Sequence, residues 1–158
     1  MDAQKALIFA MEAHEGQMDK NYLPYILHPI RVAAIASTLS DSQYVQAVAF
    51  LHDTVEDTDT TLDEIEEEFD SVVRNAVDLL TRREEETYNE FTTRLAKAEH
   101  GPVQTIARVV KFGDLKDHLD RLHLLPPGER GIAKRYIKAA QLLDFDVKFQ
   151  LVYKPAFG

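Results

Sequence analysis

Apolar residues recur at helical spacing along almost the whole of this sequence. In residues 3–17, for example, Leu7, Ile8, Ala10 and Met11 share one face of a helix. No stretch alternates apolar and polar residues for long enough to indicate a half-buried strand. The pattern therefore predicts an all-α fold, built as a compact bundle of several helices.

Start and stop signals divide this pattern into separate helices. Pro29 suits the first position of a helix, because its missing N–H would be unpaired there in any case. Thr61, followed three residues later by Glu64, has the spacing of a capping box. The predicted helices cover residues 3–17, 28–39, 42–56, 61–69, 71–82, 88–99, 103–122 and 126–146.

Size and composition narrow the classes of protein that fit. The chain has 158 residues and 45% hydrophobic content, so we expect a single domain over residues 1–158 with a sizeable core. No segment approaches the roughly 18 consecutive apolar residues of a membrane span, and the N-terminus lacks the marks of a signal peptide. We therefore expect a cytoplasmic protein without membrane contact. A net charge of −9 argues against binding to nucleic acid.

One histidine and three acids gather in the short stretch "LHDTVEDT", residues 51–58, at the end of the apolar run "VQAVAFLH". On a helix, His52 lies beside Glu56, and Asp53 lies beside both Glu56 and Asp57. Three acids near apolar residues repel one another and lose hydration unless a cation lies among them. A divalent metal would supply that cation. His52 and Asp53 could both reach it from a helix end or a widened turn.

Two further ligands for such a metal can be found elsewhere in the sequence. The chain has no cysteine, so any metal must bind to imidazole and carboxylate groups. His28 lies at the start of a predicted helix, and Asp114 follows an apolar face with Gly113 beside it to permit close approach. Each residue alone has an ordinary explanation, since a histidine before proline usually caps a helix and a helical aspartate usually faces solvent. Only the combination, in this order, indicates a metal site.

Four segments of the chain resemble a known family: "AHEGQMDKNYLPYILHPIRVAAI", "AVAFLHDTVEDT", "LTRREEETYNEF" and "VVKFGDLKDHLD". They resemble the HD-domain metal-dependent phosphohydrolases, in the branch that contains the (p)ppGpp hydrolase domains of RelA/SpoT proteins and their small single-domain relatives. The resemblance implies one metal ion, typically Mn²⁺, with ligands at His28, His52, Asp53 and Asp114.

The same resemblance implies an activity and the residues that carry it. Glu56 and Asp57 would be the catalytic acids, which position a water molecule and take its proton. The reaction would be hydrolysis of the 3′-pyrophosphate of (p)ppGpp, giving GDP or GTP and pyrophosphate. We expect no synthetase activity, because the resemblance to the hydrolase domain takes up most of the chain.

The residues expected to contact the nucleotide depart from the family pattern. The family's loop before "PY..HP" usually carries Arg-Lys, whose first member contacts the base, whereas this chain has Asp19 and Lys20. After the last metal ligand the family usually reads Arg-Leu-His-Asn, and here His118 occupies the place of the asparagine. The predicted substrate-binding residues are Lys20, Arg82, Arg83, Lys111 and His118.

Some of these residues have a second explanation. Arg82 and Arg83 fit equally well as cations at a helix C-terminus. His14 either lines the site or packs beneath it.

Three functions remain open from the sequence. The first is a manganese-dependent (p)ppGpp hydrolase. The second is a phosphohydrolase of the same branch that acts on another nucleotide, such as a nucleoside mono- or triphosphate, and Asp19 and residues 115–118 favour it. The third is a catalytically silent, metal-binding regulatory domain. Glu56 and Asp57 argue against the third, since a structural metal site has no need of two extra acids.

Overall fold

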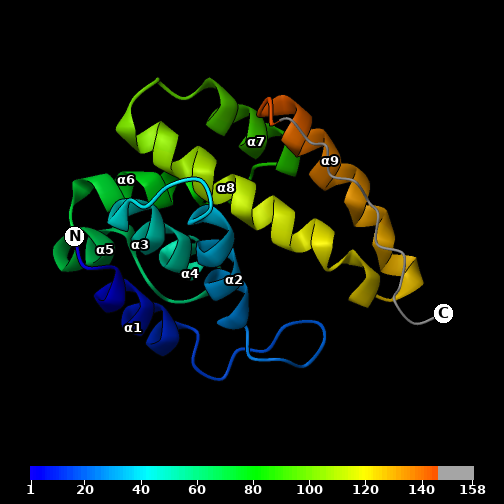
Figure 1. Ribbon diagram of the computed structural model, residues 1–158, viewed down its shortest axis with the longest axis horizontal. Helices are drawn as coiled ribbons and strands as arrows, with labels where there is room; N and C mark the ends of the chain where they lie inside the picture. The colour runs from blue at the N-terminus through cyan, green and yellow to red at the C-terminus, as the bar shows by residue number, and fades with distance from the viewer. Residues whose placement is uncertain (146–158) are drawn as a thin grey trace.

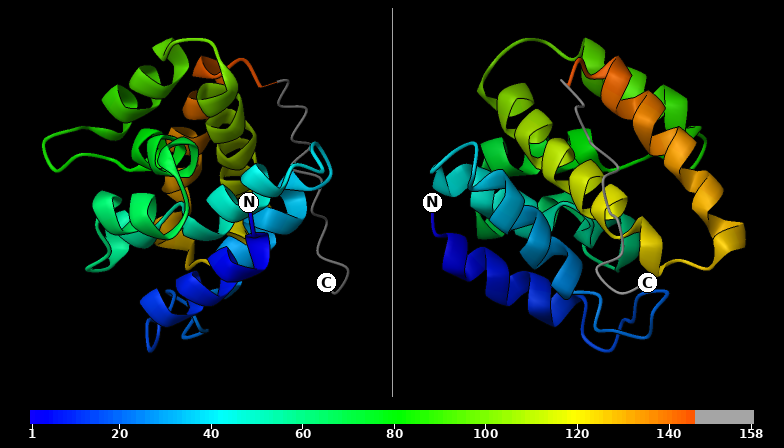
Figure 2. Two further views of the ribbon diagram at one scale, coloured as in Figure 1. Left: turned by 90° about the vertical axis from the view of Figure 1, so that its left-hand side faces the viewer. Right: turned by 45° about the vertical axis from the view of Figure 1, so that its right-hand side comes forward.

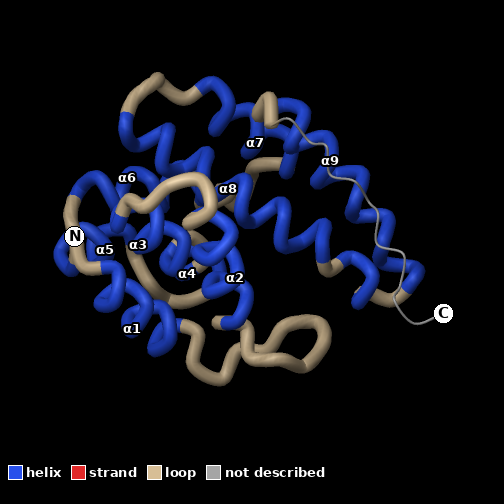
Figure 3. Tube along the Cα trace, in the orientation of Figure 1, coloured by secondary structure: helices blue, strands red, loops and turns tan. Residues whose placement is uncertain are grey.

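The computed structural model describes residues 1–145, and over these residues it consists of helices and connecting loops (Figures 1 and 3). The predicted all-α fold is confirmed. None of the helices within this part of the chain combines the length and the apolar character that a bilayer crossing requires. In chain order the helices are α1 (Ala3–Ala13), α2 (Leu27–Ala36), α3 (Gln43–Leu51), α4 (Thr54–Asp57), α5 (Leu62–Glu68), α6 (Ser71–Leu80), α7 (Tyr88–Lys97), α8 (Pro102–Asp120), the 3₁₀ helices η1 (Leu122–Leu124) and η2 (Pro127–Ile132), and α9 (Ala133–Leu142).

Helix α8 runs through the centre of the molecule and contacts α2, α3, α6, α7 and α9 (Figure 1). Its apolar face, which includes Val110 and Leu115, is fully buried. Helix α1 packs on α3 on one side of this centre, whereas α9 lies along α7 and α8 on another side (Figure 2). Residues from α2, α3 and α8 therefore meet in the interior.

Gly113 sets how closely α8 approaches α2. A Cβ atom on this residue would lie 2.9 Å from the carbonyl oxygen of Val32 and 3.2 Å from its Cγ1 atom. Such a distance is shorter than carbon and oxygen atoms tolerate, so the two backbones can touch only because residue 113 has no side chain. The close approach expected beside Asp114 is present, and α2 supplies the other surface.

Most predicted helices are present with ends shifted by a few residues. The capping box of Thr61 and Glu64 is present, because the Thr61 hydroxyl accepts from the Glu64 N–H and the Glu64 carboxylate accepts from the Thr61 N–H. The first helix stops at Ala13, before the left-handed Gly16 with φ of 76°. Helix α2 begins two residues before Pro29. The predicted final helix divides into η2 and α9, and its predicted end at residue 146 lies outside the described residues.

The predicted helix over residues 42–56 is interrupted at His52 and Asp53, which form a turn between α3 and α4. Side chains satisfy carbonyl groups of the last turn of α3. The His52 ring nitrogen Nδ1 donates to the carbonyl of Ala49 at 2.8 Å, and the Thr54 hydroxyl donates to the carbonyl of Leu51 at 2.8 Å. The turn lets the two neighbouring side chains point to one place.

Candidate metal centre

Three helical segments bring the four predicted metal ligands together. His28 lies in α2, His52 ends α3, and Asp114 lies in α8, and each offers an atom within 4.8 Å of the atoms offered by the other two. Asp53, in the turn, joins them: its Oδ2 atom is 3.0 Å from His52 Nε2 and 3.5 Å from His28 Nε2. The turn after α3 is therefore what presents adjacent residues to a single point.

The orientation of both imidazole rings fits a metal. Each ring uses Nδ1 for a hydrogen bond, His52 to the Ala49 carbonyl and His28 to Asp117, both at 2.8 Å. The two Nε2 atoms are buried and have no hydrogen-bond partner among the described residues. Buried nitrogens without a partner are costly, and two of them facing carboxylates form the donor set that divalent cations prefer. The residues present therefore fit a divalent metal ion.

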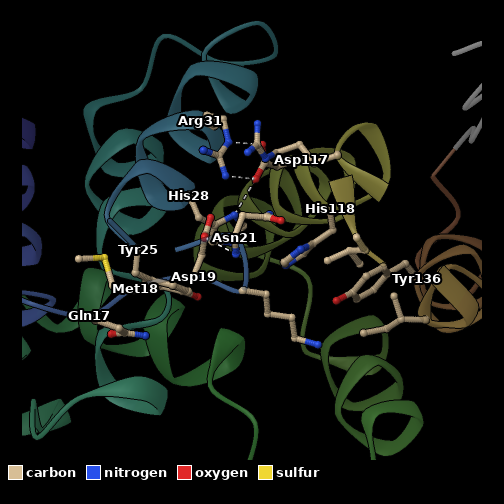
Figure 4. Close-up of a pocket in the computed structure, with 14 residues that line it drawn as sticks. Gln17, Met18, Asp19, Asn21, Tyr25, His28, Arg31, Asp117, His118 and Tyr136 are labelled. Atoms are coloured by element: carbon tan, nitrogen blue, oxygen red, sulfur yellow. Dashed lines mark hydrogen bonds and ion pairs between the residues drawn. The ribbon is translucent and has the colours of Figure 1, made fainter. Parts of the chain in front are cut away.

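Asp117, which the sequence did not single out as a site residue, holds His28 in place (Figure 4). Its Oδ2 accepts from His28 Nδ1, and its two oxygens accept from Arg31 Nε at 2.6 Å and Nη2 at 3.0 Å. Burial alone would raise the pKa of Asp117, but the hydrogen bonds from His28 and Arg31 lower it below its ordinary value. Asp117 is therefore an ionised carboxylate that accepts the proton on His28 Nδ1, so the neutral form of His28 carries its lone pair on Nε2.

The charges at the centre favour a cation strongly. Burial would lower the pKa of His28, but the carboxylates of Asp114, Asp117 and Asp53 raise it to about 10. The pKa of His52 is also raised, since the Asp53 carboxylate outweighs the effect of burial. The same carboxylates favour any positive charge here, whether a proton on imidazole or a divalent ion.

Two further groups hold Asp53 and Asp114. Tyr25 donates its hydroxyl to Asp53 Oδ2 at 2.5 Å, and the buried Lys111 ammonium lies 2.7 Å from Asp114 Oδ2. Burial would raise the pKa of Asp114, but Lys111 holds it well below its ordinary value. Lys111 itself packs against the rings of Tyr88 and Phe91. Both aspartates are therefore ionised and fixed.

Glu56 and Asp57, the predicted catalytic acids, line a cavity of about 210 Å³ together with His52, Asp53 and Asp114. Burial and the charge of Asp53 raise the pKa of each above its ordinary value. Arg82 supports Glu56, because its backbone N–H donates to Glu56 Oε2 at 2.9 Å. We name this space the metal cavity.

A second cavity of about 270 Å³ adjoins the metal cavity (Figure 4). Tyr25, His118 and Tyr136 line both spaces and therefore lie between them. The His118 ring lies 4.7 Å from the ring of His28 and stacks on Tyr136 at 4.9 Å. The remaining lining of this outer cavity comes from the loop before α2, from α2 and α8, and from the segment between α8 and α9. It comprises Gln17, Met18, Asp19, Lys20, Asn21, His28, Arg31, Asp117, Arg121, Leu125 and Ile132.

The predicted substrate-binding residues do not all lie together. Arg82, Lys111 and His118 line the metal cavity, and Lys20 lines the outer cavity, where its ammonium pairs with Glu129 at 2.6 Å. Arg83 lines neither of these two cavities, because its guanidinium turns towards Asp78 at 3.4 Å.

Two residues whose role the sequence left open have definite places. Asp19 uses Oδ1 to accept from the N–H groups of Asn21 and Leu23, so it shapes its own loop. His14 is buried, its Nδ1 lies 2.8 Å from Gln17 Oε1, and its ring lies 5.0 Å from that of Tyr25. His14 therefore packs beneath the loop that carries Tyr25.

A family model described as "HD domain" matches residues 6–109, which is more than half of the chain. The chain belongs to the HD-domain family. This HD-domain protein is accordingly a metal-dependent phosphohydrolase, and the resemblance noted in its sequence is confirmed. A divalent metal is implied by the family, in agreement with the donor set described above.

Curated relatives and a solved structure are similar over most of the HD-domain protein. It is 40% identical over 125 residues to guanosine-3′,5′-bis(diphosphate) 3′-pyrophosphohydrolase MESH1 of Xenopus tropicalis, covering 72% of this chain and 68% of that one. It is 36% identical over 148 residues to MESH1 of Homo sapiens, covering 88% and 81%. The structure of a metazoan ortholog of SpoT that hydrolyses ppGpp superimposes with a TM-score of 0.78 at 25% identity, covering 90% of this chain and 85% of that one.

Proposed function

We propose that this HD-domain protein hydrolyses the 3′-pyrophosphate of (p)ppGpp to GDP or GTP and pyrophosphate, with Mn²⁺ as the metal and without synthetase activity. The observation that carries the proposal is the cluster of two imidazoles and two aspartates, with two further acids lining the cavity beside it. The names of the MESH1 relatives, which cover most of the chain, support the choice of substrate.

In this proposal His28, His52, Asp53 and Asp114 hold the metal, through Nε2 of each histidine and a carboxylate of each aspartate. When bound there, a divalent ion lowers the pKa of water and polarises a phosphoryl oxygen. Asp117, Tyr25 and Lys111 keep three of these side chains in fixed positions by the hydrogen bonds and the ion pair described above. Fixed positions matter because a ligand displaced by a fraction of an ångström weakens both metal binding and catalysis.

Glu56 and Asp57 supply proton transfer in the proposed reaction. Their pKa values are raised towards neutral pH, and a carboxylate with a higher pKa is a stronger base that accepts a proton more readily. The Arg82 N–H holds Glu56, whose Oε1 also lies 3.8 Å from the Arg82 guanidinium. One of these acids takes a proton from the attacking water, and the other orients the water molecule.

The outer cavity is the proposed place of the nucleoside. It adjoins the metal cavity at Tyr25, His118 and Tyr136, and the stacked pair of His118 and Tyr136 offers an aromatic wall beside which a base can lie. Of the predicted substrate-binding residues, Lys20 and His118 line this outer cavity and would contact the nucleoside.

A second candidate function is hydrolysis of a different nucleotide. Its support is specific: Asp19 stands where the family usually has arginine, and its Oδ1 already accepts two backbone N–H groups. The Nε2 atom of His118 likewise lies 3.0 Å from Asp114 Oδ1, so this ring nitrogen already has a partner within the protein. Nucleoside mono- and triphosphates are the alternatives to test.

Product analysis by chromatography tests both functions. Purified protein is offered ppGpp, pppGpp, NADPH and a panel of nucleoside mono-, di- and triphosphates, with Mn²⁺, with Mg²⁺ and with chelator. We expect manganese-dependent conversion of ppGpp to GDP and pyrophosphate, well above all other substrates. Preferential cleavage of another nucleotide would reject the alarmone and retain the phosphohydrolase. Equal rates with chelator would reject the metal dependence.

A further inference from the structure

Three cationic side chains line the metal cavity, and two of them already serve its carboxylates. Lys111 is paired with Asp114 at 2.7 Å, and Arg82 is held against Glu56 by its backbone N–H, with its guanidinium 3.8 Å away. The third cation, Arg135 of α9, has no carboxylate oxygen within 4.0 Å among residues 1–145. Its charge is therefore available to a ligand.

Aromatic rings hold the Arg135 guanidinium. Its Cζ atom lies 4.5 Å from the centre of the Tyr88 ring and 5.6 Å from that of Tyr136. A guanidinium over an aromatic face is stabilised by the ring while N–H groups at its edge can still donate. One hydrogen bond joins Arg135 to the Tyr136 side chain, and the guanidinium has further N–H groups beyond that one. Such a group can donate two parallel hydrogen bonds to a phosphate. The side chain is also exposed, so an entering substrate can reach it.

The acids that line the metal cavity make an additional cation favourable for phosphate binding. Asp53, Glu56, Asp57 and Asp114 all line the space, so a phosphate group that enters meets strong repulsion. A divalent ion offsets part of it. A guanidinium that is not paired with any of these acids offsets more, and Arg135 lines the same cavity as they do.

We propose that Arg135 binds a phosphate or pyrophosphate group of the substrate in the metal cavity. The proposal rests on the proposed function in that the reacting phosphate enters this cavity. It adds a residue that the sequence did not indicate, from a helix beyond the residues 6–109 that the family model matches.

Binding of inorganic pyrophosphate to the manganese-loaded protein tests Arg135. Titration calorimetry compares wild type, R135Q, R135K and K134Q, with metal content measured on each sample. Lys134, the neighbouring residue on α9, is exposed and lines neither of the two cavities described here, so K134Q is a matched change of charge. We expect R135Q to weaken pyrophosphate binding by about tenfold or more at unchanged manganese content, since the lost contact is a charged, two-pronged one. R135K should weaken pyrophosphate binding less than R135Q does, and K134Q should change the affinity by less than about twofold.

The outcomes separate this assignment from the choice of substrate. Pyrophosphate that binds wild type and R135Q equally, or binds neither, overturns the role of Arg135. A fall in affinity in R135Q, in a protein that cleaves another nucleotide in place of ppGpp, would keep Arg135 as the phosphate-binding residue and reject the alarmone. In steady-state assays on the substrate that is cleaved, R135Q should raise KM by a larger factor than it lowers kcat.

Discussion

The metal cavity and the outer cavity meet at the same three aromatic side chains, yet they are built differently. The metal cavity takes its polar groups mainly from helices and from the turn after α3, and its aspartates are held by neighbours: Tyr25 holds Asp53, and Lys111 holds Asp114. Asp117 holds His28, whose Nε2 faces these aspartates although both residues line the outer cavity. The outer cavity is lined largely by the loop before α2 and by the segment between α8 and α9. The first is a rigid set of interlocked side chains, and the second is a surface of loops.

The polar groups of the outer cavity serve mostly the protein itself. Asp19 caps its own loop, and Lys20 ties that loop to Glu129 in η2. Much of the rest is apolar, as at Met18, Leu125 and Ile132. In the proposed function, the metal cavity carries out the chemistry and the outer cavity selects the substrate. Loops tolerate change better than packed helices do, so selection can vary while the chemistry stays.

Removing a metal ligand should have the largest effect. In Asp53→Ala, two imidazoles lose the carboxylate that lies between them, so we expect no manganese binding and no activity. Wild type should gain thermal stability on addition of Mn²⁺, and this variant should not. Asp41→Ala, an exposed loop residue, is the control. Wild-type metal content in the Asp53 variant would remove Asp53 from the ligand set.

Removing a catalytic acid should separate chemistry from metal binding. Glu56→Gln keeps the shape of the side chain but cannot take a proton, so we expect normal manganese content and a fall in kcat of about 10² or more. The exposed Glu67→Gln is the matched control. An unchanged kcat would mean that Glu56 is not a proton acceptor, and Asp57→Asn would then be the variant to examine.

Asp117→Asn tests whether the proposed metal ligand His28 depends on the carboxylate that holds its ring. The amide can no longer match both Arg31 and the His28 N–H as an ionised carboxylate does, so we expect manganese affinity to fall by about 10- to 100-fold. Calorimetry with MnCl₂ measures it, and Asp120→Asn, three residues later and exposed, is the control. Equal affinities would show that His28 is held without Asp117.

The outer cavity should respond in the opposite way. Met18→Ala removes an apolar group from its wall, and we expect KM to rise about fivefold with manganese affinity unchanged, the scale of one small buried apolar contact. Met11 is a close match, because it is 53% exposed against 56% for Met18 and lies in α1, away from both of these cavities. If Met11→Ala and Met18→Ala gave the same KM, the nucleoside would not occupy the outer cavity.

Much of the fold could be predicted because its signals are local. Helical spacing located the main helices, and the capping box at Thr61 lies where its four residues predict it. The break after α3 is also local, but it depends on side-chain hydrogen bonds from His52 and Thr54 that compete with a continuous helix, and spacing alone cannot weigh these. The sequence predicted that adjacent His52 and Asp53 could reach one point from a helix end or a widened turn. Spacing alone continued the helix to residue 56 and so did not locate the turn at these two residues.

The contacts that hold the site were harder to predict because they are not local. Asp117 lies three residues after Asp114, as Arg31 lies three after His28, and this paired spacing on two helices that touch at Gly113 is a signal that could have been used. Arg135 offers no such signal. Its place depends on how α9 packs on α7 and α8, which pairs residues far apart in the sequence.

The smallest effect is expected from changing Glu86, whose ion pair with Arg94 holds the segment next to Arg82. Arg94 donates to both oxygens of Glu86, at 2.6 and 2.9 Å, and to the carbonyl of Thr81 at 2.9 Å, so it fixes the segment that carries Arg82. The Arg94 guanidinium lowers the pKa of Glu86 from 4.5 to about 2. A carboxyl whose pKa is lowered by folding stabilises the folded state at every pH above its unfolded-state pKa. That contribution is lost as the pH falls from about 4.5 towards 2.

Glu86→Gln should therefore lower the free energy of unfolding at pH 7 by on the order of 1 kcal/mol, since the pair is partly open to solvent. The difference from wild type should shrink as the pH falls through this window, and urea unfolding at a series of pH values measures it. Glu85→Gln, on the same loop and exposed, is the control. A difference that stayed constant down to the lowest pH would mean that Glu86 contributes shape and not charge. The rim of the metal cavity would then be fixed by hydrogen bonds that do not depend on ionisation, unlike the carboxylates at its centre.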